Sequence, residues 1–340
     1  MTIKNVFQGI FQGIKTGDDK IFILNGKFEG NHFIGYSNKL NKEIKIEKDI
    51  LKPILKGEDI KKYAPLYSNL HIIYPHKIDE KLQTKPYEEN ILKDIFPLTY
   101  EYLLNFKDEL IAKKIKYKTN PIYWYSLHRA RDLNLINQEK ILTPDISYKS
   151  NMSLDNLNSC HIGQYNLIKK NNIEENHKFY LSILNSQLMW FFIKNTSNEF
   201  RGGFFVYQTN FLEPFPLPKL ENLEQQNPFI EKADLMLELN KKLQELKQNF
   251  YDELKLEKLT NKLQKFEELE FDDFIKEYTK SKKIKFADKL EERNFKNDWK
   301  ALFENDKKEV LEIQNQINIT DKEIDQMVYK LYDLTEDEIK

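Results

Sequence analysis

Three prolines at alternate positions, in the stretch Pro214-Phe215-Pro216-Leu217-Pro218, constrain the fold more than any other feature of this chain. Proline has no amide hydrogen and a fixed φ, so such a run fits neither a helix interior nor a central strand. We therefore expect an extended boundary here between two domains, residues 1–220 and residues 221–340. A chain of 340 residues has room for about two domains of ordinary size.

The first domain is predicted to be α+β, with mixed strands and helices in an irregular topology. Short apolar stretches alternate with glycine-containing turns and predict strands over residues 20–24, 32–36, 43–46 and 71–74. A helix is expected over residues 96–116, where Pro97 suits the first turn. A second helix, over residues 179–192, is apolar nearly all round and should be buried.

The second domain is predicted to be all-α. Leucines recur every three or four residues over residues 229–269, with a phase shift after Phe250. This pattern is coiled-coil-like, and the phase shift favours two packed helices over one rod. The sequence Thr320-Asp321-Lys322-Glu323 has the form of a capping box and predicts that a final helix begins there. We expect a helical bundle without catalytic groups.

Charge is distributed unevenly between these two parts. Residues 221–340 hold 22 lysines and arginines against 30 acidic residues, a net charge of −8. Because the whole chain has a net charge of −1, residues 1–220 carry +7. A basic domain joined to an acidic one fits polyanion binding by the first, although solvated lysines alone could produce this charge.

Composition excludes several protein classes. Hydrophobic residues make up 40% of the chain, which is enough for a real core and argues against disorder. No apolar run approaches the ~18–20 residues that span a bilayer, and the N-terminus lacks a signal-peptide pattern. The single cysteine, Cys160, cannot form an intramolecular disulfide or a cysteine zinc cluster. We expect a cytoplasmic protein without membrane contacts.

The N-terminal stretch VFQGIFQGIKTGDDKIFIL (residues 6–24) has the glycines, lysine and threonine of a phosphate-binding loop. A nucleotide-binding P-loop needs glycine, lysine and a hydroxyl residue in direct succession and is followed by a helix. Here Ile14 separates Gly13 from Lys15, and a strand is expected next. The nucleotide interpretation therefore fails, and a nucleic-acid backbone, or no phosphate at all, remains for this loop. We expect Asp18 to fix the turn through its side chain rather than to bind a metal ion.

Catalytic motifs are weak. Asn120-Pro121-Ile122-Tyr123 differs by one residue from the Asn-Pro-Pro-Tyr motif with which amino-methyltransferases hold a flipped adenine. However, no glycine-rich loop for S-adenosylmethionine accompanies it, so a turn is the favoured interpretation. Asp145 and Lys149 lack the second carboxylate of a nuclease site, and Cys160-His161 lacks partners for zinc. The sequence does not indicate an enzyme, and no cofactor or metal is expected in this chain.

Recognition signals are stronger. The segment Tyr123-Trp124-Tyr125-Ser126-Leu127-His128-Arg129-Ala130-Arg131 gathers aromatic rings and two arginines, in a chain where arginine is scarce. Arginine offers a planar fork of donors that can pair with a guanine edge or with phosphates, although an ion pair with Asp132 is the plain structural alternative. Arg201-Gly202-Gly203 forms a second such loop, in which glycine permits close backbone approach.

Taken in order, several segments resemble the TaqI-like C-terminal specificity domain. This domain is the target recognition domain of type IIG restriction–modification enzymes and related adenine-N6 DNA methyltransferases. The matching segments are residues 12–20, LKPILKGEDIKKY (51–63), FPLTYEYLLNFKDEL (96–110), WYSLHRARD (124–132), KILTPDIS (140–147), LSILNSQLMWFFIK (181–194), RGGFFVY (201–207), FLEPFPLPKL (211–220) and IDQMVYKLYDLTEDEIK (324–340).

The resemblance implies a domain that reads double-stranded DNA opposite a methyltransferase domain. In the family the catalytic part precedes this domain, whereas Met1 here stands about ten residues before the first matching segment. We therefore expect a non-catalytic specificity subunit, a truncated gene product or an excised fragment, with S-adenosylmethionine and Mg²⁺ held only by a catalytic partner. The candidate DNA contacts are Lys15, Thr16, Gly17, Trp124, Tyr125, His128, Arg129, Arg131, Lys149, Arg201, Gly202, Gly203 and Tyr207.

Three alternatives stay open. The chain could be an interaction or scaffold protein that acts through its helical tail, or a degenerate remnant of a split restriction–modification enzyme. It could also be a complete methyltransferase that uses residues 120–123, which the missing glycine-rich loop argues against. On the favoured hypothesis, the helical region docks a methyltransferase or nuclease polypeptide, or a second copy of the chain.

Overall fold

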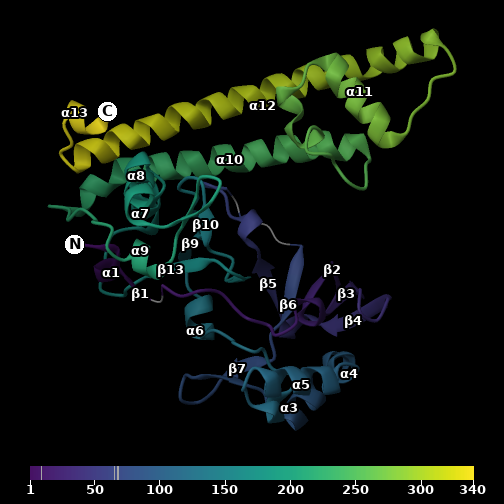
Figure 1. The fold of residues 1–340 in the computed structure, drawn as a ribbon, viewed down its shortest axis with the longest axis vertical. Coiled ribbons are helices and arrows are strands. Elements are labelled where there is room, and N and C mark those ends of the chain that lie inside the picture. Colours follow the sequence, from purple (N-terminus) through teal and green to yellow (C-terminus); the bar gives the residue numbers. More distant parts are fainter. Residues whose placement is uncertain (9, 65, 67–68) are drawn as a thin grey trace. The chain divides into compact units, whose positions relative to one another are not determined.

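The computed structural model describes residues 1–8, 10–64, 66 and 69–340. These residues divide into two compact units, Met1–Asn227 and Pro228–Lys340 (Figure 1). Gly9, in the first copy of the repeated Phe-Gln-Gly-Ile, lies outside the described residues. Within the described part of the chain, no helix combines the length and the apolar character that crossing a bilayer requires.

The first unit contains all the described strands. In chain order they are β1 (Phe7–Gln8), β2 (Ile23–Glu29), β3 (His32–Ser37), β4 (Lys42–Glu47), β5 (Leu51–Leu55), β6 (Leu70–Ile73), β7 (His76–Ile78), β8 (Thr84–Pro86), β9 (Lys140–Thr143), β10 (Ile146–Ser147), β11 (Ser153–Asp155), β12 (Cys160–His161), β13 (Tyr165–Lys169), β14 (Glu199–Arg201) and β15 (Phe204–Val206). Its α-helices are α1 (Ile3–Val6), α2 (Asp19–Phe22), α3 (Glu89–Ile95), α4 (Pro97–Leu104), α5 (Lys107–Lys116), α6 (Leu133–Ile136), α7 (His177–Leu184), α8 (Gln187–Thr196) and α9 (Thr209–Leu212).

These strands form small sheets whose neighbours are mostly distant in sequence. One sheet has the order β12-β5-β6-β2-β3-β4, a second β1-β13-β9-β11, a third β10-β15-β14, and β7 pairs with β8. The pairing of β12 with β5 is parallel, and the other described pairings are antiparallel. The predicted α+β class of this unit is therefore confirmed.

The core of the first sheet continues into the helices that follow it in the chain. Phe33 and Ile46 of the sheet share one buried cluster with Leu103 of α4 and Leu110 of α5. Trp124 belongs to the same cluster, so the segment after α5 is anchored in this core. The loops near residues 15 and 129 are thus supported by packed elements.

The proline segment is extended and pairs with the start of the chain. Pro216 forms an antiparallel bridge with Thr2. The Leu217 N–H donates to the Met1 carbonyl at 2.8 Å, and the Ile3 N–H donates to the Phe215 carbonyl at 3.0 Å. Residues 1–3 and 215–217 therefore pair with each other, and we call this pairing the clasp.

Three predictions of element boundaries in this unit need correction. The strand expected over residues 20–24 begins only at Ile23, because Asp18 caps the helical turn α2 and its side chain accepts the Lys20 N–H. The helix expected over residues 96–116 is broken between α4 and α5. The Asn105 side chain donates to the Glu101 carbonyl there, and Phe106 leaves helical backbone angles.

The buried helix expected over residues 179–192 is likewise two helices. Ser186 caps α8 by accepting the Met189 N–H, while Asn185 accepts the Met152 N–H at 2.8 Å. Helix α7 is buried as predicted, but Phe191 on α8 is exposed. Asn185-Ser186 is a recognisable N-cap signal. The prediction of a single helix gave more weight to the continuous apolar pattern than to this signal.

The second unit is helical, as predicted. It consists of α10 (Asn227–Leu254), α11 (Phe271–Lys282), α12 (Lys289–Leu331), α13 (Glu336–Ile339) and a 3₁₀ segment, η5 (Leu263–Glu268). Helix α10 ends where the leucine pattern shifts phase. The helix start predicted at Thr320 is wrong: Thr320 lies buried inside α12, which runs unbroken for 43 residues.

Aromatic rings, rather than a leucine seam, fill the core of the second unit. Phe274 of α11 stacks on Phe303 of α12, with ring centroids 4.6 Å apart, and on Tyr278. Phe250 of α10 stacks on Phe266 at 3.8 Å. The coiled-coil expectation is not confirmed.

Candidate nucleic-acid interface

Two of the segments predicted to bind DNA lie side by side. Lys15 and Arg129 form an antiparallel bridge, in which the Arg129 N–H donates to the Lys15 carbonyl at 2.8 Å and the Lys15 N–H donates back at 3.1 Å. The His128 N–H extends the pairing by donating to the Thr16 carbonyl at 3.1 Å. This short ladder aligns the two basic segments along one edge.

Glycines make this approach possible. Gly17 has φ +91°, in the left-handed region, and a Cβ there would lie 3.3 Å from the His128 Cβ. At Gly13 a Cβ would lie 2.1 Å from the His161 carbonyl oxygen, so any larger residue would push the segment away from β12. The glycines of this stretch thus serve turn geometry and close packing of the backbone.

A pocket opens beside the ladder, with a volume of about 880 Å³. We call it the basic pocket. It is lined by Ile14, Lys15, Thr16, Gly17, Asp18, Asp19, Lys20, Lys39, Lys113, Tyr117, His128, Arg129 and Ile162. Among these lining residues, five lysine or arginine side chains face two carboxylates, so the pocket is electropositive.

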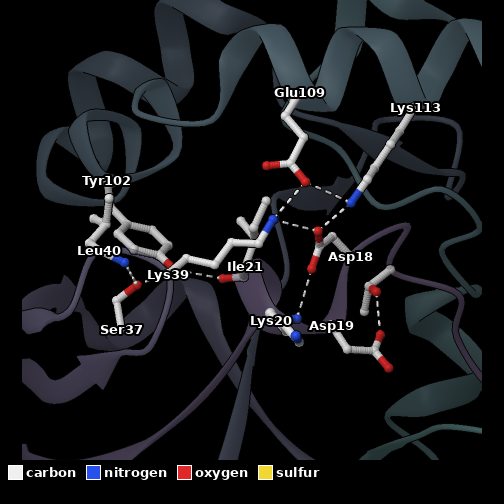
Figure 2. A network of polar contacts seen from close by, with 11 residues as sticks. Asp18, Asp19, Lys20, Ile21, Ser37, Lys39, Leu40, Tyr102, Glu109 and Lys113 are labelled. Carbon is white, nitrogen blue, oxygen red and sulfur yellow. Dashed lines mark hydrogen bonds and ion pairs between the residues drawn. The ribbon is translucent and has the colours of Figure 1, made fainter.

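Asp18 organises one wall of the basic pocket (Figure 2). Its carboxylate pairs with Lys39 at 2.8 Å and with Lys113, and both lysines also reach Glu109, at 2.6 and 3.0 Å. Burial opposes ionisation of Asp18, but the two lysines outweigh it and lower its pKa to about 2. Asp18 therefore fixes this turn through its side chain, as predicted, and the cluster holds Lys39 and Lys113 in place.

The cations beside this cluster are less constrained. Lys15, Lys20 and Arg129 are exposed, and none of them has a carboxylate partner among the residues that the structure describes. Thr16, by contrast, is buried, and its hydroxyl donates to the Asp19 carboxylate. Lys15 and Arg129 are thus available to an anionic ligand, whereas the Thr16 hydroxyl has a partner in the protein.

His128 and Tyr117 form the aromatic part of the pocket, with ring centroids 4.8 Å apart. Burial and the neighbouring charges of Lys114, Arg129 and Lys15 lower the pKa of His128. Lys114 is buried behind it and donates to the Ser126 hydroxyl at 2.7 Å. Burial lowers the Lys114 pKa to about 8.

Arg131 has a structural position. Its Nε donates to the Gly13 carbonyl at 3.1 Å, and its guanidinium lies 5.3 Å from the centre of the Phe11 ring. Burial lowers its pKa. The side chain therefore fastens the N-terminal segment to the segment that follows Trp124.

Trp124 and Tyr125 are core residues. The Trp124 indole donates to Glu89 at 3.1 Å, and the Tyr125 hydroxyl donates to the Tyr87 carbonyl at 2.6 Å. Both side chains are buried. These two side chains pack beneath the loop that carries Arg129, in the core, and are not accessible to DNA.

The remaining predicted residues gather in the sheet β10-β15-β14, apart from the ladder. Lys149 follows β10. Arg201, Gly202 and Gly203 form the tip of the β14–β15 hairpin. All four residues are exposed. Tyr207 is buried, and its N–H donates to the Asp145 carbonyl at 2.8 Å. Tyr207 thus anchors the hairpin.

Asp145 links the two groups. Burial raises the pKa of its carboxyl, while Gln208 and the charge of Lys15 lower it in part. The Lys15 charge therefore acts on Asp145, whose carbonyl accepts the Tyr207 N–H at the base of the hairpin.

Sequence reasoning missed several residues of this region. Lys39, Lys113 and Tyr117 line the basic pocket but carry no local signal, since lysine is abundant throughout the chain. Tyr148, Phe200 and Phe204 are exposed around the hairpin. Phe200 and Phe204 flank the Arg201-Gly202-Gly203 motif, so their position beside a glycine turn was a usable signal.

The rejected catalytic motifs have structural positions. Asn120 caps the 3₁₀ turn η3 (Pro121–Tyr123) by accepting the Ile122 N–H at 3.0 Å, which agrees with the favoured interpretation as a turn. Cys160 is buried, and burial raises its pKa to about 12. In the described residues, histidine, cysteine and acidic side chains form no group arranged to hold a metal ion.

Comparison with known proteins assigns much of the first unit. A type II methyltransferase, M.BstVI from Geobacillus stearothermophilus, is 25% identical over 213 residues, which cover 62% of this chain and 33% of the relative. The chain thus spans about a third of the length of this curated relative. Residues 222–328 match a domain of unknown function, DUF8810.

Residues 52–217 match the model of the TaqI-like C-terminal specificity domain. The match covers β5 to the proline boundary and includes Arg129 and Arg201, whereas Lys15 lies before it. The assignment of residues 12–20 to the same family stays a prediction. Over residues 52–217, just under half of its length, this chain is therefore similar to the TaqI-like C-terminal specificity family.

Proposed function

We propose that this chain recognises double-stranded DNA for a restriction–modification system, as the specificity part that serves an adenine-N6 methyltransferase. The specificity-domain match and the methyltransferase relative support this proposal. The observation that carries it is the ladder between Lys15 and Arg129, which puts two exposed cations beside an electropositive pocket.

The two cations have different tasks in this proposal. Lys15 and Lys20 contact phosphates, because a lysine ammonium is a compact charge without a preferred plane. Arg129 reads a base edge, since its forked guanidinium can pair with guanine in two hydrogen bonds, worth about 1–3 kcal/mol of discrimination. Phosphate contacts position the duplex, and base contacts select the sequence.

The chain acts without catalysing a reaction in this proposal. A partner polypeptide supplies S-adenosylmethionine and, where cleavage occurs, Mg²⁺. The helical second unit docks that partner or a second copy of the chain. The acidic balance of residues 221–340 disfavours DNA as the ligand of this unit.

Binding selection tests the division of tasks. Wild-type protein and the variants Lys15→Ala and Arg129→Ala are incubated with a random-sequence duplex library, and the bound DNA is sequenced at several salt concentrations. Lys15→Ala should weaken binding to all duplexes alike and reduce the salt slope by about one unit. Arg129→Ala should flatten the base preference at one position.

Lys93→Ala and Arg293→Ala are the matched controls, because both side chains are exposed and lie outside the basic pocket. They should behave as wild type. Equal weakening by Lys15→Ala and Arg129→Ala, with an unchanged base preference, would contradict the proposed roles. A wild-type protein without salt-sensitive DNA binding would favour the scaffold alternative instead.

Calorimetric titration with S-adenosylmethionine tests whether the chain is a complete methyltransferase. We expect no binding by the isolated chain. Saturable binding that Tyr123→Ala abolishes would instead give residues 120–123 a catalytic role.

A further inference from the structure

The hairpin formed by β14, Gly202-Gly203 and β15, residues 199–206, exposes aromatic rings beside cations. We call it the aromatic hairpin. The side chains of Phe200 and Phe204 are 64% and 40% exposed, and Tyr148, which contacts Phe204 with ring centroids 5.5 Å apart, is 54% exposed. Grouped exposed rings on a folded domain mark an interaction surface.

The hairpin is built to hold these rings in fixed positions. Arg201 pairs directly with Phe204, so Gly202 and Gly203 form a two-residue turn, and their φ values of +60° and +81° suit a type I′ turn. The pairing shifts register between Glu199 and Arg201, which leaves Phe200 in a bulge. Bulges re-aim side chains, and this one accounts for the exposure of Phe200.

Contacts at the base of the hairpin anchor it to the domain. Phe205 packs edge-on against Trp190 of α8 at 5.4 Å, on the face of β15 opposite to Phe204. The Ser197 hydroxyl donates to the Val206 carbonyl at 2.5 Å. Together with the buried Tyr207, these contacts let the tip project while the base stays fixed.

The charges around the rings favour a polyanion as the ligand. Arg201 at the tip has no carboxylate partner among the described residues, and the Lys149 ammonium lies 5.6 Å from the centre of the Tyr148 ring. Glu199 is the opposing charge, and its carboxylate accepts the Gly203 N–H at 3.0 Å, inside the turn. Rings flanked by such cations are the usual platform for unpaired nucleobases.

We propose that an unstacked base of DNA stacks on the exposed rings of the aromatic hairpin, Phe200 and Phe204, while Arg201 and Lys149 contact the flanking phosphates. A two-stranded ribbon is narrow enough to enter a DNA groove, and the glycine tip permits close approach to the backbone. This inference rests on the proposed DNA-binding function and adds a ligand, the displaced base, to it.

The test compares two duplexes of the same sequence, one fully paired and one with a single unpaired 2-aminopurine. The full-length wild-type protein should bind the second about tenfold more tightly and quench its fluorescence by stacking. The double variant Phe200→Leu/Phe204→Leu keeps apolar side chains but loses the ring faces. It should lose the preference, so that the two duplexes bind with equal affinity.

The matched control is Phe200→Tyr/Phe204→Tyr, which keeps both ring faces and should keep the preference. Equal wild-type affinity for the two duplexes, with salt-sensitive binding to the paired one, would overturn the inference and leave the proposed function standing. A preference that survives in the leucine variant would also overturn it. Absence of binding to either duplex would overturn the proposed function and the inference together.

Discussion

The two units of this chain achieve stability in different ways. Of the buried polar side chains in the described residues, all but Glu267, Thr320 and Asp325 lie in the first unit. There Lys140 and Asp155, 1% and 0% exposed, form an ion pair at 2.7 Å inside the core. The second unit instead stacks phenylalanine rings between helices. Polar networks specify the positions of irregular loops, whereas aromatic packing supports long regular helices.

The largest effect expected from this comparison is a loss of stability in Phe274→Ala. The ring is fully buried and contacts Phe303 and Tyr278, so its removal should cost about 4–5 kcal/mol. Urea unfolding followed by far-ultraviolet circular dichroism measures the loss. Leu290→Ala, at an exposed position of α12, should change stability by less than about 0.5 kcal/mol. Similar losses in both variants would contradict an aromatic core.

In the first unit, Asp155→Ala should be nearly as damaging, at about 3–4 kcal/mol, because it leaves the Lys140 charge buried without its partner. Urea unfolding again gives the value. The double variant Lys140→Met/Asp155→Leu should recover part of the loss, since no unpaired charge remains. If the double variant were less stable than Asp155→Ala, the ion pair would contribute more to the free energy of unfolding than the burial of its two charges costs.

Gly13→Ala should cost about 1–3 kcal/mol, because the new Cβ would lie 2.1 Å from a backbone carbonyl that cannot move freely. The variant should also lose duplex affinity as the ladder shifts. Gly57→Ala is the comparison, since its Cβ would meet only the end of the Gln164 side chain, at 3.2 Å. If the Gly13→Ala protein were destabilised but bound DNA as tightly as wild type, the ladder would not be part of the DNA-binding interface.

The smallest effect is the pH dependence due to Asp18. Its pKa is lowered to about 2 in the folded protein, so its stabilisation is present above the unfolded pKa, near 4, and is lost as pH falls through 2. Asp18→Asn keeps the helix cap but loses the ion pairs, which should cost about 1–2 kcal/mol at neutral pH. The difference from wild type should disappear between about pH 5 and pH 2. A difference independent of pH would mean that the ion pairs do not contribute.

The sequence predicts those parts of this fold that depend on local pattern. Strands β3, β4 and β6 follow from alternation between turns, and the start of α4 follows from Pro97. The breaks at Asn105 and Asn185 were not predicted, because each depends on a side chain that bonds the backbone while the apolar pattern continues. Hydrophobic periodicity indicates which residues are buried, but it does not reveal a single polar side chain that ends one helix before the next begins.

The candidate site shows the same limit. Lys15 and Arg129 stand out by composition, yet no local feature predicts their pairing, which joins segments far apart in the chain. Lys39 and Lys113 were missed because their position depends on the Asp18 carboxylate. Trp124 and Tyr207 are aromatic residues beside basic motifs, and only the structure distinguishes such core anchors from exposed rings.

The clasp between Met1 and Leu217 has a consequence for biosynthesis. The N-terminal segment pairs with residues that leave the ribosome only after the rest of the first unit. At about 5–20 residues per second, translation of this interval takes roughly 10–40 s. During this time the apolar side chains of Ile3 and Val6, which are buried in the folded unit, lack their final partners. The pairing of the two segments can therefore form only after residues up to Leu217 have been translated.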